Sequence, residues 1–212
     1  FSCSKKKDDA ASETSGTIGV VSLNTNISNS EPFSTYTTEY QSAFAIGARG
    51  AQTAAPWSSL NPTGASYDMT AVSNSFFGMS ALQGYGFTSI FLNIPIVAIS
   101  SRSMPSDISA LAFNHATVKS RIHTLIDNVV PYLNSNVKYV CFGNEVDTYF
   151  STHSSEWAAY VELVEDAKSY LQTQKPNILV GVTTTFDGAT STQLSQVATL
   201  NANMDFISLT YY

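Results

Sequence analysis

The sequence predicts an α/β protein whose parallel strands alternate with helices and form part of a (β/α)8 barrel. The first observation is the alternation itself, since short apolar runs rich in β-branched and aromatic residues are separated by helix-like segments from Gly16 onward. The second is the loop after the first strand, SLNTNISN, which contains no glycine. An open doubly wound sheet usually carries a Gly-rich phosphate loop at that place, so the barrel is favoured.

The expected elements follow one another in a regular order. The run 87–99 is continuously apolar, as is typical of a strand covered on both faces. Six βα units are fewer than the eight of a closed barrel, which typically needs about 250 residues, so we expect a barrel truncated after its sixth strand. We expect strands at 17–23, 43–50 (ending near Arg49 to Thr53), 87–99, 137–143, 178–186 and 205–212, and helices at about 34–43, 69–83, 116–133, 156–172 and 192–200.

Composition limits the classes of function. The 212 residues are 43% hydrophobic and 12% charged, which suits one domain with a sizeable core and is too polar for a membrane bundle. The formal net charge is -6, and the basic residues after position 7 are scattered rather than gathered in a stripe. Nucleic acid is therefore not an expected partner.

The N-terminal segment predicts a membrane tether. Phe1, Ser2 and Cys3 precede a polar, charged run, which is typical of the end of a bacterial lipoprotein signal whose cysteine becomes lipidated. We expect residues 1–15 to be a flexible leader, residues 16–212 to be the barrel domain, and the protein to be extracytoplasmic. The alternative is a chance cysteine in a terminal tail, and no disulfide with the strand residue Cys141 is expected.

The stretch VKYVCFGNEVD, residues 137–147, is the strongest functional signal. An apolar strand ends in Asn144 and Glu145 between two helix-like segments, so an amide and a carboxylate are presented at a strand tip. In barrel enzymes the chemistry is kept at the carboxyl ends of the strands. This stretch resembles the clan A retaining glycoside hydrolases, which carry Asn-Glu at the end of strand four. The resemblance implies that Glu145 is the general acid/base and that Asn144 bonds the 2-hydroxyl of the sugar. The alternative is a surface Glu after a core strand.

The resemblance leaves the nucleophile unassigned. A retaining enzyme needs a second carboxylate about 5 to 5.5 Å from the first, and the family takes it from strand seven, beyond the strands expected here. Asp147 and Asp187 are near the right end of the sheet, but neither matches the family position. We expect each to cap a loop or to contact substrate rather than to act as the nucleophile.

Four further residues are candidate substrate contacts. Arg49 corresponds loosely to the clan's supporting arginine, and the alternative is an ion pair with a helix carboxylate. Trp57, in the loop APWSSLNPTGASYD, either stacks on a sugar or plugs the rim of the barrel. Tyr211 and Tyr212 end the sixth strand, where the clan often keeps a tyrosine near the substrate. Neighbouring strand residues point to opposite faces, so one of the two is the candidate.

No cofactor or metal is expected. His115, His123 and His153 have no Cys, Asp or Glu around them at ligand spacing, and no G-x-S-x-G elbow is present. The leading hypothesis is a membrane-tethered glycoside hydrolase that cleaves a β-linked oligo- or polysaccharide with retention. One alternative is a noncatalytic carbohydrate-binding or structural surface lipoprotein with a barrel fold. The other is a lyase or phosphate-sugar enzyme with an anion site after its later strands.

Overall fold

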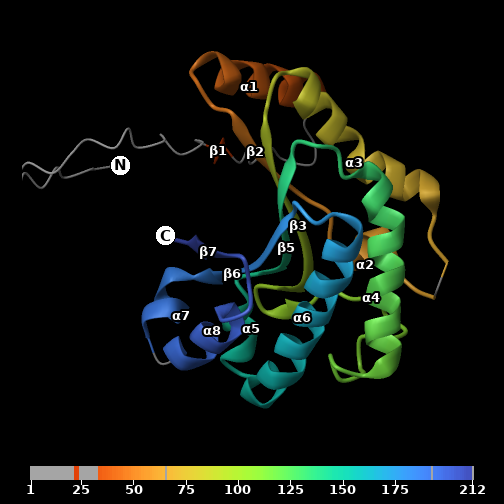
Figure 1. Cartoon of the computed structure of the whole chain (residues 1–212), viewed down its shortest axis with the longest axis vertical. Helices are drawn as coiled ribbons and strands as arrows, with labels where there is room; N and C mark the ends of the chain where they lie inside the picture. Colours follow the sequence, from red (N-terminus) through yellow and green to blue (C-terminus); the bar gives the residue numbers. More distant parts are fainter. Residues whose placement is uncertain (1–21, 24–32, 65, 192, 212) are drawn as a thin grey trace, which may run out of the picture.

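The computed structural model describes residues 22–23, 33–64, 66–191 and 193–211. One curled sheet runs through the centre of the molecule, and its main path has the strand order β1-β2-β3-β5-β6-β7 (Figure 1). Every neighbouring pair along that path is parallel. This arrangement is a half barrel built from successive βα units, so the predicted α/β class and partial (β/α)8 barrel are confirmed.

Apart from the second, the strands lie close to the expected runs, although residues 17–21 of the expected first strand lie outside the described residues. Their bounds are β1 (Ser22–Leu23), β2 (Gly50–Ala54), β3 (Ser89–Ala98), β5 (Val137–Asn144), β6 (Leu179–Thr185) and β7 (Phe206–Thr210). A short strand that the sequence does not predict, β4 (Ser101–Arg102), pairs antiparallel with the end of β3.

Helices connect the strands. The long ones are α1 (Phe33–Ala45), α3 (Met69–Gly84), α4 (Ala116–Val129) and α6 (Trp157–Gln174), with the shorter α8 (Leu194–Asn201) before the last strand. The short helices α2 (Trp57–Leu60), α5 (Val146–Phe150) and α7 (Phe186–Thr190), and the 3-10 turn η2 (Ser154–Glu156), are not predicted, whereas the 3-10 turn η1 (Val130–Tyr132) lies at the end of the helix expected at 116–133. No helix among the described residues is both long and apolar enough to cross a bilayer.

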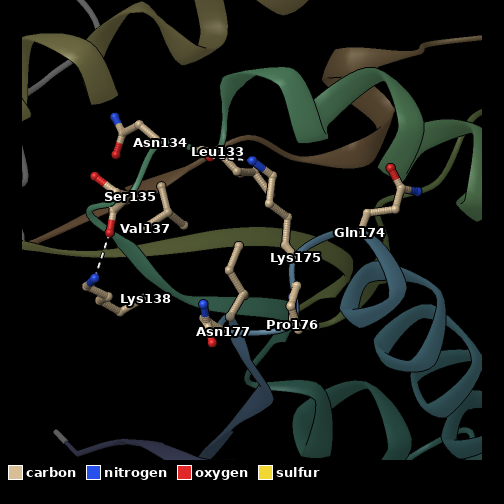
Figure 2. A pocket seen from close by; sticks show the side chains of 10 residues that line it. Leu133, Asn134, Ser135, Val137, Lys138, Gln174, Lys175, Pro176 and Asn177 are labelled. Atoms are coloured by element: carbon tan, nitrogen blue, oxygen red, sulfur yellow. Dashed lines mark hydrogen bonds between the residues drawn. The ribbon is translucent and has the colours of Figure 1, made fainter.

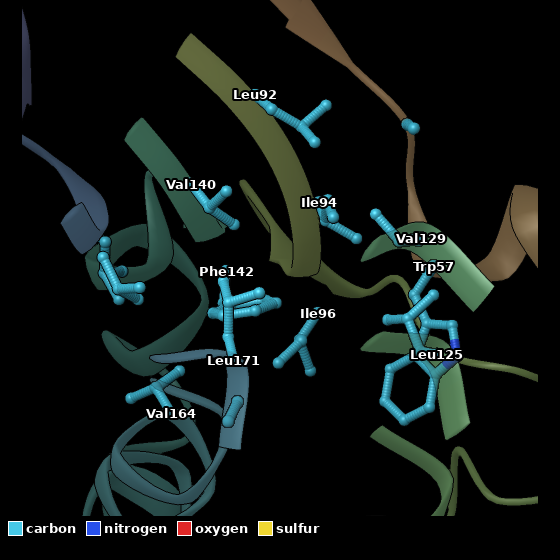
Figure 3. Packing of buried hydrophobic residues seen from close by; sticks show 14 of the residues in the cluster. Trp57, Leu92, Ile94, Ile96, Leu125, Val129, Val140, Phe142, Val164 and Leu171 are labelled. Carbon is cyan, nitrogen blue, oxygen red and sulfur yellow. The ribbon is translucent and has the colours of Figure 1, made fainter. Parts of the chain in front are cut away.

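The hydrophobic core lies between the sheet and its helices. Alternate residues of β3 and β5 point toward α4 and α6, which gives both strands their apolar character (Figure 3). The side chains labelled in Figure 3 include Leu92, Ile94 and Ile96 of β3, Val140 and Phe142 of β5, Leu125 and Val129 of α4, and Val164 and Leu171 of α6.

The opposite face of the sheet is layered like a barrel interior. Its lower layer is an aromatic cluster in which the rings of Phe91, Tyr139 and Phe206 lie 5.3 to 6.4 Å apart. The next layer toward the carboxyl ends is polar. Cys141 Sγ lies 3.2 Å from Thr183 Oγ1, which in turn donates to Ser208 Oγ over 3.0 Å. The interior therefore becomes polar toward the strand tips.

The predicted second strand begins too early. Helix α1 continues through Ala45, and β2 begins only at Gly50. Gly47 has φ 105° and closes the helix, because its N–H donates to the Phe44 carbonyl and the next N–H, from Ala48, reaches the Ala43 carbonyl. These two bonds form a Schellman motif.

Candidate active site

Glu145 lies at the carboxyl end of β5, as the strand and motif predict. It follows Asn144 directly, and it is only 6% exposed. Its backbone is left-handed, with φ 50° and ψ 45°, a conformation that is uncommon for residues other than glycine. Residues held in such conformations cluster at active sites, so the strain marks this strand tip as a candidate site.

A second strained residue lies on the neighbouring strand tip. Ile99 follows β3 and has φ 57°, and among the described non-glycine residues only Ile99 and Glu145 have positive φ. The Ile99 N–H donates to the Asn144 carbonyl over 2.7 Å. The two strained positions therefore flank one peptide group, that of Asn144 and Glu145.

The amide of Asn144 is oriented by a residue beneath it. Asn93 of β3 is 3% exposed, and its Nδ2 donates to Asn144 Oδ1 over 3.3 Å. Because the oxygen of Asn144 accepts this bond, its Nδ2 is the atom left to donate to another group. An amide donor beside a carboxylate suits the recognition of a hydroxyl group.

Asp147 binds the neighbouring loop. It is 3% exposed, and its carboxylate accepts from the Thr185 N–H over 2.8 Å and from Thr185 Oγ1 over 2.5 Å. A Cβ placed at Gly188 would overlap the carboxylate, so the glycine allows this close approach. This matches the expected loop-capping role, and it ties α5 to the tip of β6.

A partly buried ion pair supports the segment that follows Glu145. Arg102 of β4 donates to Tyr149 Oη over 3.0 Å and to Glu156 Oε2 over 2.7 Å, and Tyr149 Oη donates to the same carboxylate oxygen over 2.8 Å. Burial disfavours the charged form of Glu156, but the bonds from Arg102 and Tyr149 outweigh it and hold the pKa of that carboxyl below its ordinary value. Burial also raises the pKa of Tyr149, although Arg102 opposes this.

The same arginine fixes the loops around it. Arg102 Nη1 donates to the carbonyl oxygens of Ser109 and Leu111, and the guanidinium lies 4.0 Å above the ring of Phe113. Arg102 thus links the β3–β4 hairpin, which contains Ile99, to helix α5, which follows Glu145.

Tyr211 lies at the same end of the sheet as Glu145, one residue beyond β7. It is 80% exposed, and its ring lies edge-on to Phe186 with 5.4 Å between the ring centres. A small hollow of about 40 Å³ is lined by Thr185, Phe186, Asp187, Thr210 and Tyr211. Tyr212 and Cys3, the other predicted contact and the predicted lipid attachment site, lie outside the described residues.

The structure corrects the assignment of Arg49. This residue precedes β2 and therefore lies at the amino ends of the strands, on the rim opposite Glu145. Its Nη1 donates to the carbonyls of Phe44 and Ala48, and the guanidinium lies 4.0 Å over the Phe44 ring. The assignment was wrong because it depended on the misplaced second strand.

The structure also corrects Trp57. It is 0% exposed in the core, and its indole N–H donates to Tyr67 Oη over 3.2 Å. A side chain covered in this way does not offer a face to a sugar. Of the two roles that the sequence left open, the packing role is the one the structure supports.

The amino ends of the strands carry a separate hollow of about 360 Å³, shown in Figure 2. Two lysines line it, but each bonds a main-chain carbonyl: Lys138 Nζ that of Ser135 over 2.6 Å, and Lys175 Nζ that of Leu133 over 3.0 Å. These lysines hold the turns at the ends of η1 and α6 in place. Within the described part of the chain, no group of three or more His, Cys, Asp or Glu side chains is placed to hold a metal ion.

Sequence reasoning missed three residues around Glu145: Asn93, Ile99 and Arg102. A signal existed for Asn93, which is a polar residue in an otherwise apolar strand. Arg102 gave no signal, because its partners Tyr149 and Glu156 are 47 and 54 residues away. The strain at Ile99 depends on a two-residue hairpin that the sequence does not show.

Solved structures with a similar fold include glycosidases, although no family model and no curated protein matches the sequence. The exo-β-1,4-mannosidase Op5Man5 from Opitutaceae bacterium strain TAV5 has a TM-score of 0.70 at 13% identity, over 84% of this chain and 34% of its own. A GH5_18 variant from Streptomyces cattleya, in complex with Manβ1-4GlcNAc, has a TM-score of 0.67 at 14% identity, over 85% of this chain and 47% of its own. The β-glucosidase 1317 has a TM-score of 0.63 at 13% identity, over 84% and 55%.

This chain spans between about a third and somewhat over half of the length of these three proteins. At 13 to 14% identity the likeness establishes the fold. The chain has the fold of part of a (β/α)8 barrel of the kind found in GH5 glycoside hydrolases.

Proposed function

We propose that this chain is the part of a glycoside hydrolase that carries the general acid/base, and that the enzyme cleaves a β-linked oligo- or polysaccharide with retention. The observation that carries the proposal is the position of Glu145, a 6%-exposed carboxyl group directly after Asn144 at the carboxyl end of a half-barrel strand. The glycosidase neighbours support the same class of reaction.

Glu145 acts in both steps of this mechanism. As a carboxylic acid it gives its proton to the glycosidic oxygen while the bond from that oxygen to the anomeric carbon breaks. As a carboxylate it then takes a proton from the water that hydrolyses the glycosyl-enzyme intermediate. Asn144 Nδ2 donates to a sugar hydroxyl, an interaction that strengthens in the transition state.

The nucleophile is a second carboxylate, and none of those described around Glu145 is suited to the role. Asp147 is bound to Thr185, and Asp187 is exposed in α7. We assign the nucleophile to a carboxylate of the full-length enzyme outside this set. A carbohydrate-binding protein without hydrolytic activity is the alternative, and it is favoured if no such carboxylate completes the site.

The first substrates to test are β-mannosides and β-glucosides. The similar structures include a β-1,4-mannosidase, a β-glucosidase and a complex with Manβ1-4GlcNAc. In the full-length protein we expect hydrolysis of at least one such substrate. Glu145→Gln should lower turnover about a hundredfold or more, least for p-nitrophenyl glycosides, whose leaving group needs little protonation.

The matched control is Glu162→Gln, which removes an exposed carboxylate on α6 that pairs with Lys119 over 3.7 Å. This variant should keep wild-type turnover. Wild-type turnover of a natural disaccharide by Glu145→Gln would remove Glu145 from the mechanism. Binding of Manβ1-4GlcNAc without any cleavage would support the noncatalytic alternative.

We also propose that Cys3 carries a lipid that tethers the protein to the outer side of a cell membrane. The support is the sequence Phe1-Ser2-Cys3 followed by a polar leader. Mass spectrometry of the native N-terminal peptide should show a diacylglyceryl-modified Cys3, and Cys3→Ser should move the protein from the membrane fraction to the supernatant. An unmodified Cys3 would disprove the tether.

A further inference from the structure

The hairpin between β3 and β4 contains an unusual residue at its tip. Ala98 pairs with Ser101, so Ile99 and Ser100 form a two-residue connection. Ile99 has φ 57°, whereas Ser100 is not among the positive-φ residues, which is the pattern of a type II′ turn. Glycine is the residue that this position favours, and a β-branched side chain there is strained.

The fold does not need isoleucine at this position. Ile99 is 48% exposed, so burial of its side chain offsets only part of the free-energy cost of the strained backbone. The hairpin is held elsewhere, by the pairing of Val97 with Arg102 and by the bonds that Arg102 makes to Tyr149 and Glu156. Glycine would close the same turn with less strain.

The position of Ile99 points to the substrate. Its N–H donates to the Asn144 carbonyl over 2.7 Å, so the residue lies beside the peptide that joins Asn144 to Glu145. The residue that carries this exposed apolar side chain is therefore beside Glu145 in the backbone, at the carboxyl rim of the sheet. Strain that persists beside an active site is typical of a residue kept for function.

We propose that Ile99 is a specificity-determining residue that contacts the apolar C–H face of the pyranose ring bound at Glu145. This inference rests on the proposed function and adds a substrate contact to it. The strained turn holds the side chain at the rim, and the contact contributes to binding in the ground state and the transition state alike. Its loss therefore raises KM and leaves kcat nearly unchanged.

Two substitutions in the full-length protein separate strain from contact. Ile99→Gly removes both, so we expect KM for Manβ1-4GlcNAc to rise about five- to tenfold, kcat to stay within about twofold, and Tm to rise by about 2 to 4 °C. Ile99→Ala removes the contact but keeps a Cβ in the strained conformation. It should show the same rise in KM without the rise in Tm.

Ile46→Gly is the matched control. Ile46 is 84% exposed at the end of α1, on the rim opposite Glu145, and its φ is not positive. The control should leave KM unchanged and should not raise Tm, because glycine there adds only freedom to the unfolded chain. A wild-type KM in both Ile99 variants, or a fall in Tm on Ile99→Gly, overturns the inference.

The same measurements separate the inference from the proposed function. If the wild-type protein neither binds nor cleaves Manβ1-4GlcNAc, β-mannosides or β-glucosides, the proposed function fails and the inference fails with it. If the wild type cleaves the disaccharide and the Ile99 variants do so with the same KM, only the inference fails.

Discussion

Asn93 Nδ2 donates a hydrogen bond to Asn144 Oδ1 over 3.3 Å, from the inner face of β3 to the tip of β5. Asn93 is nearly buried, and it makes the amide of Asn144 turn its oxygen inward and its nitrogen toward the candidate site. The bond thus determines which end of the amide a substrate meets beside Glu145. A hydroxyl group placed there can accept a hydrogen bond from Asn144 Nδ2.

Replacing Asn93 by Asp tests this role. The shape is kept, but a carboxylate oxygen now faces Asn144, and the Asn144 amide is expected to turn its nitrogen inward to donate to it. We expect kcat/KM on the natural substrate to fall about 10- to 100-fold, equivalent to about 1.4 to 2.8 kcal/mol of transition-state stabilisation. The measurement is steady-state kinetics of glycoside hydrolysis by the full-length protein.

A substrate without the 2-hydroxyl is the control for this prediction. The loss should be much smaller on the 2-deoxy glycoside, because it lacks the hydroxyl group that the proposed function assigns to the Asn144 amide. An equal loss on both substrates would show that Asn93→Asp disturbs the site in general and does not act through the orientation of Asn144.

The ion pair of Glu156 with Arg102 predicts a pH-dependent stability. The pKa of Glu156 lies below its ordinary value of 4.5, so the folded state favours the charged carboxylate. This stabilisation is complete above the ordinary pKa and is lost as the pH falls through the lowered one. At pH 7 we expect Glu156→Gln to lower the free energy of unfolding by about 1 kcal/mol, because a partly exposed pair is screened by solvent.

Denaturant unfolding at several pH values measures this effect. The difference between the wild type and Glu156→Gln should be constant from pH 7 to about pH 5 and should shrink toward zero below the lowered pKa, since the wild-type carboxyl then becomes neutral too. A difference that persists unchanged after the wild-type carboxyl has been protonated would mean that the charge on Glu156 does not stabilise the fold.

Cys141 is predicted to be an unreactive thiol in the folded protein. Burial raises its pKa to about 11, against the smaller opposite effect of its bonds to Thr183 and Gly143. In a Cys3→Ser background, a thiol reagent such as DTNB at pH 8 should label the native protein only at the rate of unfolding. In guanidinium chloride one thiol per chain should react at once. Rapid labelling of the native protein would show that the inner face of β5 opens.

The sequence was sufficient to predict those elements that a local pattern of residues determines. The apolar runs around 87–99, 137–143 and 178–186 form the central strands, and Glu145 lies at a strand tip, because β-rich runs and their boundaries are local signals. The second strand was misplaced because 43–50 reads as an apolar run, although Gly47 is the Schellman glycine that ends α1. The end of helix α1 could therefore have been predicted from this glycine.

Long-range contacts limited the prediction of the site. Trp57 occupies the core, and its burial depends on packing against elements distant in sequence. The hydrogen bond between Asn93 and Asn144 joins residues 51 apart, and no local pattern shows it. The motif placed Asn144 and Glu145 at a strand tip, whereas the residue that orients Asn144 emerged only from the fold.

Gly143 lies directly before Asn144 and Glu145, and its substitution tests how closely the end of β5 is packed. A Cβ at this position would overlap the hydroxyl oxygen of Tyr160 and Cγ1 of Val146. Gly143→Ala should therefore destabilise the protein by about 1 to 3 kcal/mol through overpacking. Tyr160→Phe alone also destabilises it, because the Tyr160 hydroxyl donates to the Phe142 carbonyl over 3.1 Å.

The double variant distinguishes overpacking from other causes. In Gly143→Ala/Tyr160→Phe the new methyl group can occupy the space that the hydroxyl has left, so its free energy of unfolding should exceed the value expected from adding the two single effects by about 1 kcal/mol. Rescue is expected to be partial, since the overlap with Val146 remains. Simple additivity in urea unfolding would show that the close approach of α6 to the end of β5 is not what requires glycine at position 143.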